Sequence, residues 1–245
     1  TDGTSTLVIR PKTSFWSLIK LLVKYQREQT MVTILSHWDY NQFQKQLSKQ
    51  FDWSPTELGE ELMDPTNQKR WNEQTWLKKK GLDSYNWQAI AIPNSYMFKK
   101  ITTPIQVLDR LVKEAHDFWT KERMLAASKL GLTPVEVVKL ASIVTKESNH
   151  VPEYGKIAST YKNRLKIDML LQADPTVVFA RGRAGRVLNR DTKIESPYNT
   201  YLYSGLPIGA LCIPSLNAID SCLFGAQYPY VYFCAKSDLT PQHDF

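Results

Sequence analysis

The pattern of apolar and polar positions is clearest between residues 133 and 149, where it predicts an α-helix with well-marked ends. Thr133 is suited to the N-cap, a proline follows at the first helical position, and Glu136 can complete a capping box. One apolar stripe, spaced by three, four and three residues, consists of Val137, Leu140, Val144 and Glu147. The stripe therefore ends in a carboxylate.

A carboxylate in this position is subject to two effects on its ionisation. Apolar surroundings remove water from Glu147, and the negative end of the helix dipole lies close by, so both effects favour the protonated form. A carboxyl group that stays protonated near neutral pH can donate a proton to a leaving group. The alternative interpretation is that the helix frays and leaves Glu147 solvated, as most glutamates are.

The N-terminal part of the chain alternates between strand and helix patterns. The predicted elements are a strand at residues 7–10, a helix at 14–27, a strand at 31–35 and a helix at 39–50. Asp39 is suited to the N-cap of the last of these helices. We therefore expect a β-α-β-α subdomain over residues 1–51.

The remaining chain is predicted to be mainly helical at first and mixed afterwards. Residues 51–81 are polar and include a helix that is capped near Ser54, and we interpret residues 52–103 as a helical connecting region. A single helix over residues 104–130, with apolar residues at helical spacing, leads to the helix at 133–149. The expected fold class is α+β, with residues 104–245 as a mixed α+β domain.

Composition places the chain among globular proteins. Its 245 residues are 42% hydrophobic and 11% aromatic, which suits one large or two modest domains with buried cores. No stretch reaches the roughly 20 apolar residues that a membrane-spanning helix needs, and no signal peptide opens the sequence. The sequence as given predicts a soluble piece.

The net charge of the chain limits the classes of partner that it is expected to bind. Lysine and arginine outnumber aspartate and glutamate by 31 to 24, giving a net charge of +7. The excess is scattered, apart from Lys78, Lys79, Lys80 and the series Arg181, Arg183, Arg186 and Arg190, and no nucleic-acid-binding motif accompanies it. We expect no nucleic acid partner, whereas a cell-wall polymer with carboxylates or an anionic membrane surface fits the charge.

The three cysteines, Cys212, Cys222 and Cys234, lack the paired spacing of a zinc site. They are expected to be buried, with at most one disulfide. The sequence predicts no metal site and no cofactor.

Four sequence blocks stand in one order in the C-terminal part: ASIVTKES (141–148), IASTYKNRLKIDMLLQADPTVVFA (157–180), SPYNTYLYSGLPIGALCIPS (196–215) and YVYFCAK (230–236). In order and spacing they resemble the YceG-like family of endolytic murein transglycosylases. The close resemblance extends over about residues 131–245, and several blocks in one order are more specific than one short motif. The resemblance implies that Glu147 is the catalytic residue.

The resemblance also implies a reaction. The enzyme would cut peptidoglycan strands internally at the β-1,4 bond between N-acetylmuramic acid and N-acetylglucosamine, leaving 1,6-anhydro ends. Because the C6 hydroxyl of muramic acid attacks C1, one glutamate can give a proton and then take one. A glycoside hydrolase would need a second carboxylate, for which Asp174 is a candidate, whereas Glu195 is expected at the surface. A glycan-binding scaffold with an idle site is the other alternative.

The same blocks supply candidate substrate-binding residues: Asn163, Arg164, Gln172, Asp174, Thr176, Ser196, Tyr198, Asn199 and Thr200. Arg164 can form a planar fork to a carboxylate of the substrate or a structural ion pair. Residues 172–176 are expected to form a loop. The resemblance implies that residues 196–201 lie along the glycan cleft, so Asn199→Ala is expected to lower activity without changing stability.

Further implications concern the ends of the chain. Residues 1–51 resemble a LysM module weakly, and Trp16 is either a core residue or part of a glycan platform. The family implies an N-terminal membrane anchor before Thr1, a place on the periplasmic face of the bacterial inner membrane, and contacts with the cell-wall elongation machinery. The sequence is expected to stop before the family's final helix, and His243 either stabilises the fold or assists the site.

Overall fold

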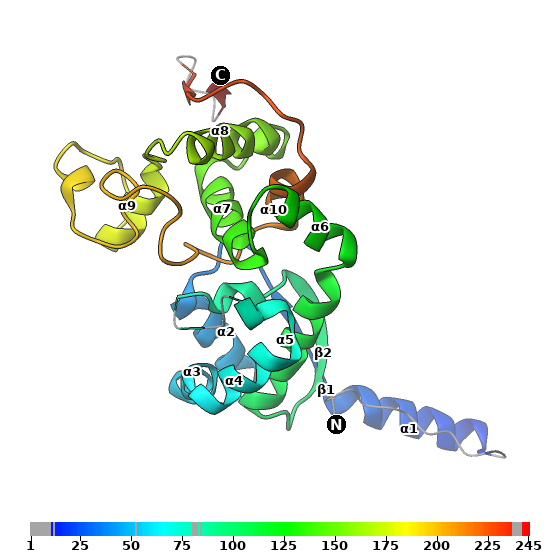
Figure 1. Ribbon diagram of the computed structural model, residues 1–245. Coiled ribbons are helices and arrows are strands. Elements are labelled where there is room, and N and C mark those ends of the chain that lie inside the picture. The colour runs from blue at the N-terminus through cyan, green and yellow to red at the C-terminus, as the bar shows by residue number, and fades with distance from the viewer. Residues whose placement is uncertain (1–10, 12, 52, 80–82, 84, 237–241) are drawn as a thin grey trace.

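The computed structural model describes residue 11 and residues 13–51, 53–79, 83, 85–236 and 242–245. It confirms an α+β protein, rich in helix and with two small sheets among the described residues. Figure 1 shows a lower and an upper body in contact, with α1 (Phe15–Arg27) projecting away from the lower one. No helix in the described ranges is long and apolar enough to cross a bilayer.

The lower body is built around a two-stranded antiparallel sheet. Its elements are β1 (Gln29–Ile34), α2 (Tyr40–Phe51), α3 (Pro55–Met63), α4 (Pro65–Gln74), β2 (Asn94–Lys99) and α5 (Pro104–Phe118), with the 3-10 turns η1 (Trp76–Lys79) and η2 (Trp87–Ile90). Val32 pairs with Tyr96 and Ile34 pairs with Asn94. Val32, Ile34, Tyr96 and Phe98 are all buried, so one face of the sheet packs on the core.

The structure confirms three of the four elements that the sequence predicts before residue 52. The helix α1, the strand β1 and the helix α2 are present, and the backbone N–H of Gln42 donates to the Asp39 carboxylate at 2.8 Å, as expected for an N-cap. The strand predicted at residues 7–10 lies outside the described residues. The partner of β1 is β2, a strand that the sequence interpretation missed. The proposed boundaries at residues 51 and 103 stay a prediction, and the lower core draws on residues from 32 to 115 and on Val135 and Ile213.

The predicted single helix over residues 104–130 is wrong. The chain forms α5 and then α6 (Lys121–Lys129), with a break at Trp119 and Thr120. Thr120 caps α6 by accepting from the backbone N–H of Arg123, and the Trp119 side chain is buried in the upper core. The break lets α5 pack in the lower body while Trp119 and α6 belong to the upper one.

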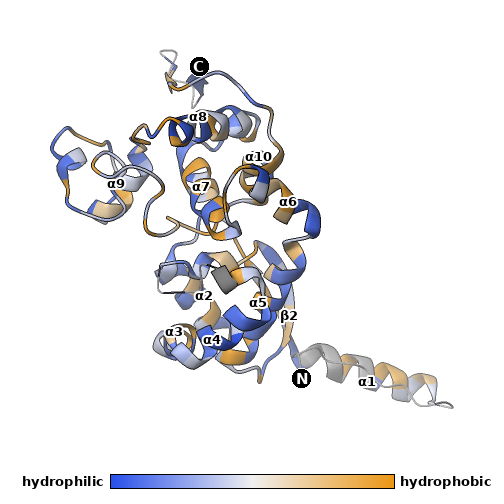
Figure 2. Ribbon diagram, viewed as in Figure 1, coloured by the Kyte–Doolittle hydropathy of each residue, from blue (hydrophilic) through white to orange (hydrophobic). Residues whose placement is uncertain are grey.

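The upper body surrounds α7, whose hydrophobic residues are visible in Figure 2. Its elements are α6, α7 (Pro134–Glu147), α8 (Tyr154–Lys166), α9 (Asp174–Arg181), α10 (Leu216–Phe224), β3 (Cys234–Ala235) and β4 (His243–Asp244), with the 3-10 turns η3 (Val151–Glu153) and η4 (Asp191–Lys193). The capping box of Thr133 and Glu136 is confirmed. Val137, Leu140 and Val144 are fully buried as predicted, but α7 is buried on its other faces as well.

The two bodies are joined along residues 209–215. The backbone N–H of His37 donates to the carbonyl of Ile213 at 2.8 Å, and Ile213 donates to the carbonyl of Trp38 at 2.9 Å. On the other side, Ser142 of α7 accepts from the backbone N–H of Leu211 at 3.0 Å. This segment is therefore hydrogen bonded to both bodies and fixes α7 relative to the loop before α2.

The cysteines follow the prediction in part. Cys212 and Cys222 are buried, and burial raises the pKa of each thiol to about 12, so they act as small apolar side chains. Cys234 is exposed, contrary to expectation. All three are free thiols.

Candidate active site

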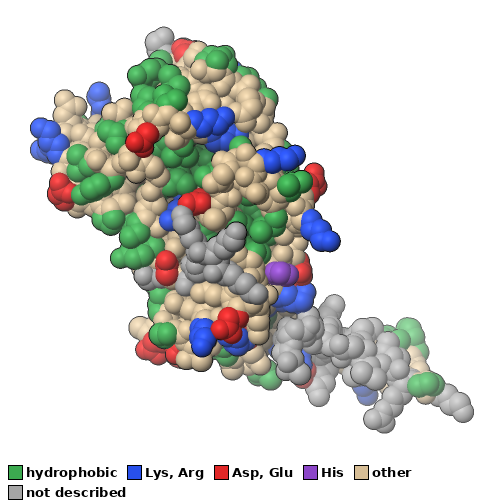
Figure 3. Space-filling view, viewed as in Figure 1, with side chains coloured by type: hydrophobic (Ala, Val, Ile, Leu, Met, Phe, Trp, Pro, Cys, Tyr) green, Lys and Arg blue, Asp and Glu red, His purple; other side chains and the backbone are tan. Residues whose placement is uncertain are grey.

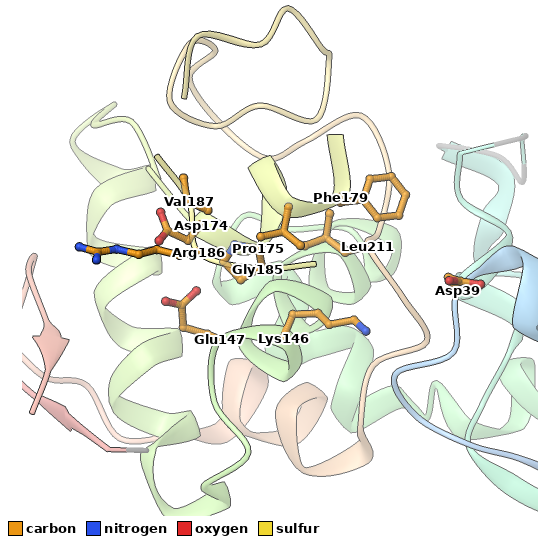
Figure 4. A pocket seen from close by; sticks show the side chains of 11 residues that line it. Asp39, Lys146, Glu147, Asp174, Pro175, Phe179, Gly185, Arg186, Val187 and Leu211 are labelled. Atoms are coloured by element: carbon orange, nitrogen blue, oxygen red, sulfur yellow. The ribbon is translucent and has the colours of Figure 1, made fainter. Parts of the chain in front are cut away.

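Glu147, the last residue of α7, lies where two cavities meet. The first has a volume of about 470 Å³ and is lined by Asp39, Lys146, Glu147, Asp174, Pro175, Val178, Phe179, Gly185, Arg186, Val187 and Leu211. Figure 4 shows Glu147 beneath Asp174 and Arg186, with Asp39 at the far end of the cavity. This cavity therefore extends from the upper body to the edge of the lower one.

The second cavity has a volume of about 340 Å³ and is lined by Glu147, Tyr161, Arg164, Gln172, Asp174, Tyr201, Phe233, Cys234, Ala235 and His243. Both volumes lie in the range of small-molecule sites. Glu147 and Asp174 line both cavities. A chain-like ligand that occupied both cavities would pass over these two carboxylates.

The Glu147 carboxyl group is held in a state suited to acid chemistry. Burial raises its pKa to about 7, and the charge of Asp174 acts in the same direction. The Tyr161 hydroxyl donates to Oε2 of Glu147 at 3.1 Å and opposes the rise, because it stabilises the charged form. The carboxyl group is therefore not the freely solvated group that fraying of the helix would leave, although it keeps some surface toward the cavities.

A second tyrosine holds the neighbouring carboxylate. The Tyr201 hydroxyl donates to Oδ1 of Asp174 at 2.5 Å, and burial together with this bond raises the pKa of Tyr201. Each carboxylate at the cavity junction thus has one tyrosine donor. Tyr161 of α8 donates to Glu147, and Tyr201 of the loop after η4 donates to Asp174. Both carboxylates are therefore oriented by tyrosine hydroxyls.

His243 lines the second cavity and is anchored to the end of η3. Its backbone N–H donates to Oε1 of Glu153 at 2.8 Å, and its Nδ1 lies 2.9 Å from Oε2 of the same carboxylate. The Ser148 hydroxyl, just after α7, also donates to this Glu153 oxygen at 3.3 Å. The contacts to His243 and Ser148 hold the pKa of Glu153 below its usual range although burial acts against them. Glu153 therefore ties the C-terminal β4 to the end of α7.

Four of the sequence-predicted site residues meet in the cavities: Glu147, Arg164, Gln172 and Asp174. Arg164 is buried, and its guanidinium donates to the carbonyls of Val231 and Leu171, both at 2.7 Å. No ion pair involves it among the described residues, so the structural ion pair is not found, and a carboxylate of the substrate as its partner stays a prediction. Gln172 is exposed and has a positive φ of 45°.

The other predicted residues line neither of these cavities. The Asn163 amide donates to the carbonyls of Tyr228 and Tyr230 at 2.7 and 2.8 Å, so it holds the segment that leads to β3. Ser196 lines a separate surface hollow with Glu195 and Tyr203. The ring of Tyr198 packs against Phe179, with centroids 4.5 Å apart. Glu195 is at the surface, as expected.

Three of the predicted residues are buried in the loop scaffold, which corrects their placement along the cleft. Asn199 is fully buried, and its amide donates to the carbonyls of Thr192 and Ile194 and accepts from the N–H of Tyr201. The hydroxyls of Thr176 and Thr200 are 2.9 Å apart and also bond the backbone of Ala173. The loop expected at residues 172–176 is wrong from Asp174 onward, because Asp174 opens α9.

The sequence interpretation missed the parts played by Tyr161, Tyr201, Phe233 and Arg186. Tyr161 carried a usable signal, because it lies three residues before Arg164 on one helix and so shares its face. Phe233 carried none, and Arg186 carried only its place in the arginine series, because their positions at the cavities depend on folded loops. Among the described residues, no cluster of three or more histidine, cysteine, aspartate or glutamate side chains is arranged to hold a metal ion.

A carboxyl group with a raised pKa, at the end of the helix with the ASIVTKES block and between two cavities, is consistent with the resemblance of the sequence. The model of the YceG-like family matches residues 4–245. The chain belongs to the YceG-like family. The crystal structure of a YceG-like protein from Listeria monocytogenes is similar to this YceG-like chain, with a TM-score of 0.74 and 26% identity, covering 88% of this chain and 72% of that one.

Two curated relatives carry the name endolytic murein transglycosylase. The protein of Bacillus subtilis strain 168 is 32% identical over 149 residues, which are 60% of this YceG-like chain and 41% of the relative. The protein of Streptococcus pneumoniae serotype 2 strain D39 is 31% identical over 157 residues, which are 62% of this chain and 28% of the relative. The chain therefore spans less than half the length of these relatives.

Proposed function

We propose that this chain is the catalytic part of an endolytic lytic transglycosylase that cuts peptidoglycan strands between N-acetylmuramic acid and N-acetylglucosamine. The observation that carries the proposal is the position of Glu147, with a pKa raised to about 7, at the junction of two cavities. Two cavities that meet at one acid suit a polymer bound on both sides of the bond to be cut. The names of the curated relatives support the substrate class.

In this mechanism Glu147 acts first as an acid and then as a base. Its proton passes to the glycosidic oxygen as the bond to C1 breaks, and the sugar left behind develops oxocarbenium character. The C6 hydroxyl of the same muramic acid attacks C1, and the Glu147 carboxylate takes the hydroxyl proton. The products are a 1,6-anhydro end and a free C4 hydroxyl, and no water is consumed.

The test is the variant Glu147→Gln, which keeps the shape of the side chain but cannot transfer a proton. Purified peptidoglycan treated with the wild type should yield 1,6-anhydro ends by mass spectrometry, and the variant should yield almost none. Substantial cleavage by the variant would exclude Glu147 as the acid.

The same variant has a pH-dependent effect on stability that checks its folding. Because the folded pKa of Glu147 is raised from 4.5 to about 7, its neutral form stabilises the fold at low pH, and this contribution is lost as the pH rises through about 7. Glu147→Gln should therefore gain stability relative to the wild type between pH 4.5 and pH 8. Denaturant unfolding at both pH values measures the difference.

A glycoside hydrolase is the second candidate, and the position of Asp174 favours it. Asp174 lines both cavities with Glu147, and a hydrolase needs a second carboxylate to activate water or to attack the sugar. Cleavage in water enriched in heavy oxygen separates the two reactions. The transglycosylase leaves the muramic acid end unlabelled, whereas a hydrolase incorporates the label there.

The setting of the enzyme is a further part of the proposal and rests on family membership. We place it on the periplasmic face of the bacterial inner membrane, with an anchor outside this chain and with cell-wall elongation proteins as partners. The LysM-like role of the N-terminal part also remains a proposal. It is supported by Trp16 on α1, whose side chain is 72% exposed and so is available to stack on a sugar.

A further inference from the structure

The loop between α9 and η4, residues 182–190, is folded around one buried arginine. The Arg181 guanidinium donates to the carbonyls of Arg183 and Arg186, both at 2.9 Å, and also to the carbonyl of Gly185. It forms an ion pair of 2.7 Å with Asp191, and the two side chains are only 4% and 6% exposed. A guanidinium that donates to the loop backbone in several places gives the loop a defined shape.

Asp191 and Arg181 are paired with each other inside the loop, whereas a second arginine, Arg186, lies at the first cavity. Asp191 also accepts from the backbone N–H of Leu188 at 2.9 Å, so its carboxylate is engaged within the loop. Arg186 lines the first cavity beside Gly185 and Val187. Its side chain is exposed, and none of the ion pairs within the described ranges uses it.

The two basic residues of the first cavity, Lys146 and Arg186, differ in their hydrogen-bond partners and in the direction of their side chains. Lys146 donates to the carbonyl of His37 at 3.0 Å, which directs it toward the lower body. Figure 4 shows Arg186 extending over Glu147, away from the direction of Lys146. Figure 3 shows lysine and arginine side chains projecting from the edge of the molecule that carries α9. Arg186 therefore adds a guanidinium to the lining of the cavity that contains Glu147.

We propose that Arg186 binds a carboxylate of the peptide that peptidoglycan carries on its muramic acid units, so that the chain prefers peptide-bearing strands. The inference rests on the proposed function. The peptide is attached through the lactyl group of the muramic acid, the sugar on which Glu147 acts, so it leaves the cavity near this residue. Its free carboxylates match the planar fork of a guanidinium. The loop built on Arg181 holds the backbone of Arg186 before binding, which lowers the backbone entropy lost on association.

The acidic residues of the same cavity do not compete for Arg186. Asp174 accepts the Tyr201 hydroxyl. Asp39 lies at the other end of the cavity and caps α2 through the backbone N–H of Gln42. The third acid of the cavity, Glu147, accepts the Tyr161 hydroxyl at 3.1 Å. None of the three forms an ion pair with Arg186 in the part of the chain that the structure describes. A carboxylate supplied by the substrate would therefore meet a guanidinium without an acidic partner.

The test measures binding, so it does not depend on cleavage. Glycan strands with intact peptides and strands stripped by an amidase are titrated into the Glu147→Gln protein, which holds the strands without cutting them. The preference for peptide-bearing strands should fall by about five- to tenfold when Arg186→Gln is added, and binding of stripped strands should not change. Arg190→Gln, which removes the same charge from the same loop outside the cavity, is the matched control and should keep the preference.

A third substrate tests whether the peptide carboxylate is the group that Arg186 binds. Strands whose peptide carboxylates have been converted to amides should bind the Arg186 protein as weakly as native strands bind the Arg186→Gln protein. Combining the amidated strands with Arg186→Gln should weaken binding no more than either change alone. The preference should also decline as the salt concentration rises.

Equal weakening on peptide-bearing and stripped strands, or a preference that survives Arg186→Gln, would overturn the proposal. Loss of preference with Arg190→Gln as well would show a general charge effect and overturn it too. These results are distinct from failure of the proposed function, which would appear as wild-type protein that releases no 1,6-anhydro ends whichever strands it binds.

Discussion

Tyr161 and Glu147 are 14 residues apart in the sequence, and their side chains meet at a hydrogen bond of 3.1 Å. At the scale of the residue, this contact both orients the carboxyl group and sets its acidity. Burial alone would push the pKa of Glu147 higher, and the tyrosine hydroxyl lowers it toward about 7. The proposed reaction needs both forms of the group, so a pKa near the working pH serves both steps.

Tyr161→Phe tests this balance. Without the hydroxyl the charged form loses a donor, so the pKa of Glu147 should rise by about 0.5–1 unit, which corresponds to one hydrogen bond. The alkaline limb of the pH profile of kcat/KM should move to higher pH, because the acid stays protonated longer. Tyr203→Phe is the matched control, since the Tyr203 hydroxyl donates to Glu195 at the surface. A limb that stays in place would show that Tyr161 does not tune the acid.

At the scale of the element, the loop after η4 is built by side chains that the sequence interpretation assigned to the substrate. Asn199 joins Thr192 and Ile194 to the backbone of Tyr201, whose hydroxyl holds Asp174. The amide is fully buried and makes all of these bonds inside the protein. Its contribution to the site is therefore to the shape of the loop.

Asn199→Ala should therefore destabilise the fold, contrary to the expectation from sequence. The change leaves two part-buried carbonyls without a donor, which costs about 1–3 kcal/mol in the free energy of unfolding. Denaturant unfolding measures this loss. Asn189→Ala, at an exposed position of the preceding loop, should change stability by less than about 0.5 kcal/mol. Unchanged stability with reduced activity in Asn199→Ala would instead restore a direct role in glycan binding.

At the scale of the whole molecule, the two bodies meet closely at residues 209–215. A side chain on Gly209 would place its Cβ 2.3 Å from the carbonyl oxygen of Tyr85 in the lower body and 2.7 Å from the hydroxyl of Tyr198 in the upper one. Glycine is needed here for the close approach of two backbones. Leu211, two residues later, forms part of the first cavity.

Gly209→Ala should separate these segments and disturb the cavity. We expect a loss of about 1–3 kcal/mol in the free energy of unfolding, as for overpacking in a core, together with reduced strand cleavage. Gly155→Ala is the matched control, because a Cβ there meets no atom within 4 Å and the residue lies in α8. The control should be neutral or stabilising by up to about 1 kcal/mol. A stable and active Gly209→Ala protein would show that the contact between the two bodies at residues 209–215 is not rigid.

The sequence by itself determined the elements whose signals are local. The helix α7 was predicted with its capping box and buried stripe, because N-caps and helical periodicity depend on residues within a few positions of one another. The order of the sequence blocks indicated the family, which the family model confirms, and the role of Glu147 as the acid stays a proposal. The strand β2 and the break between α5 and α6 were missed, because the first depends on pairing with β1 and the second on burial of Trp119 in the other body.

Only the tertiary structure decided which polar side chains line the two cavities and which support the fold. Asn163, Thr176, Asn199 and Thr200 have the same chemistry as sugar-binding residues, but each is hydrogen bonded to backbone groups of the protein. Arg164 finds its acceptor at Val231, 67 residues away, and Glu153 finds His243 at a distance of 90 residues along the chain. A buried polar group must be satisfied by whatever the fold places beside it, and that neighbour is set by the packing of distant segments, which residue type and spacing do not specify.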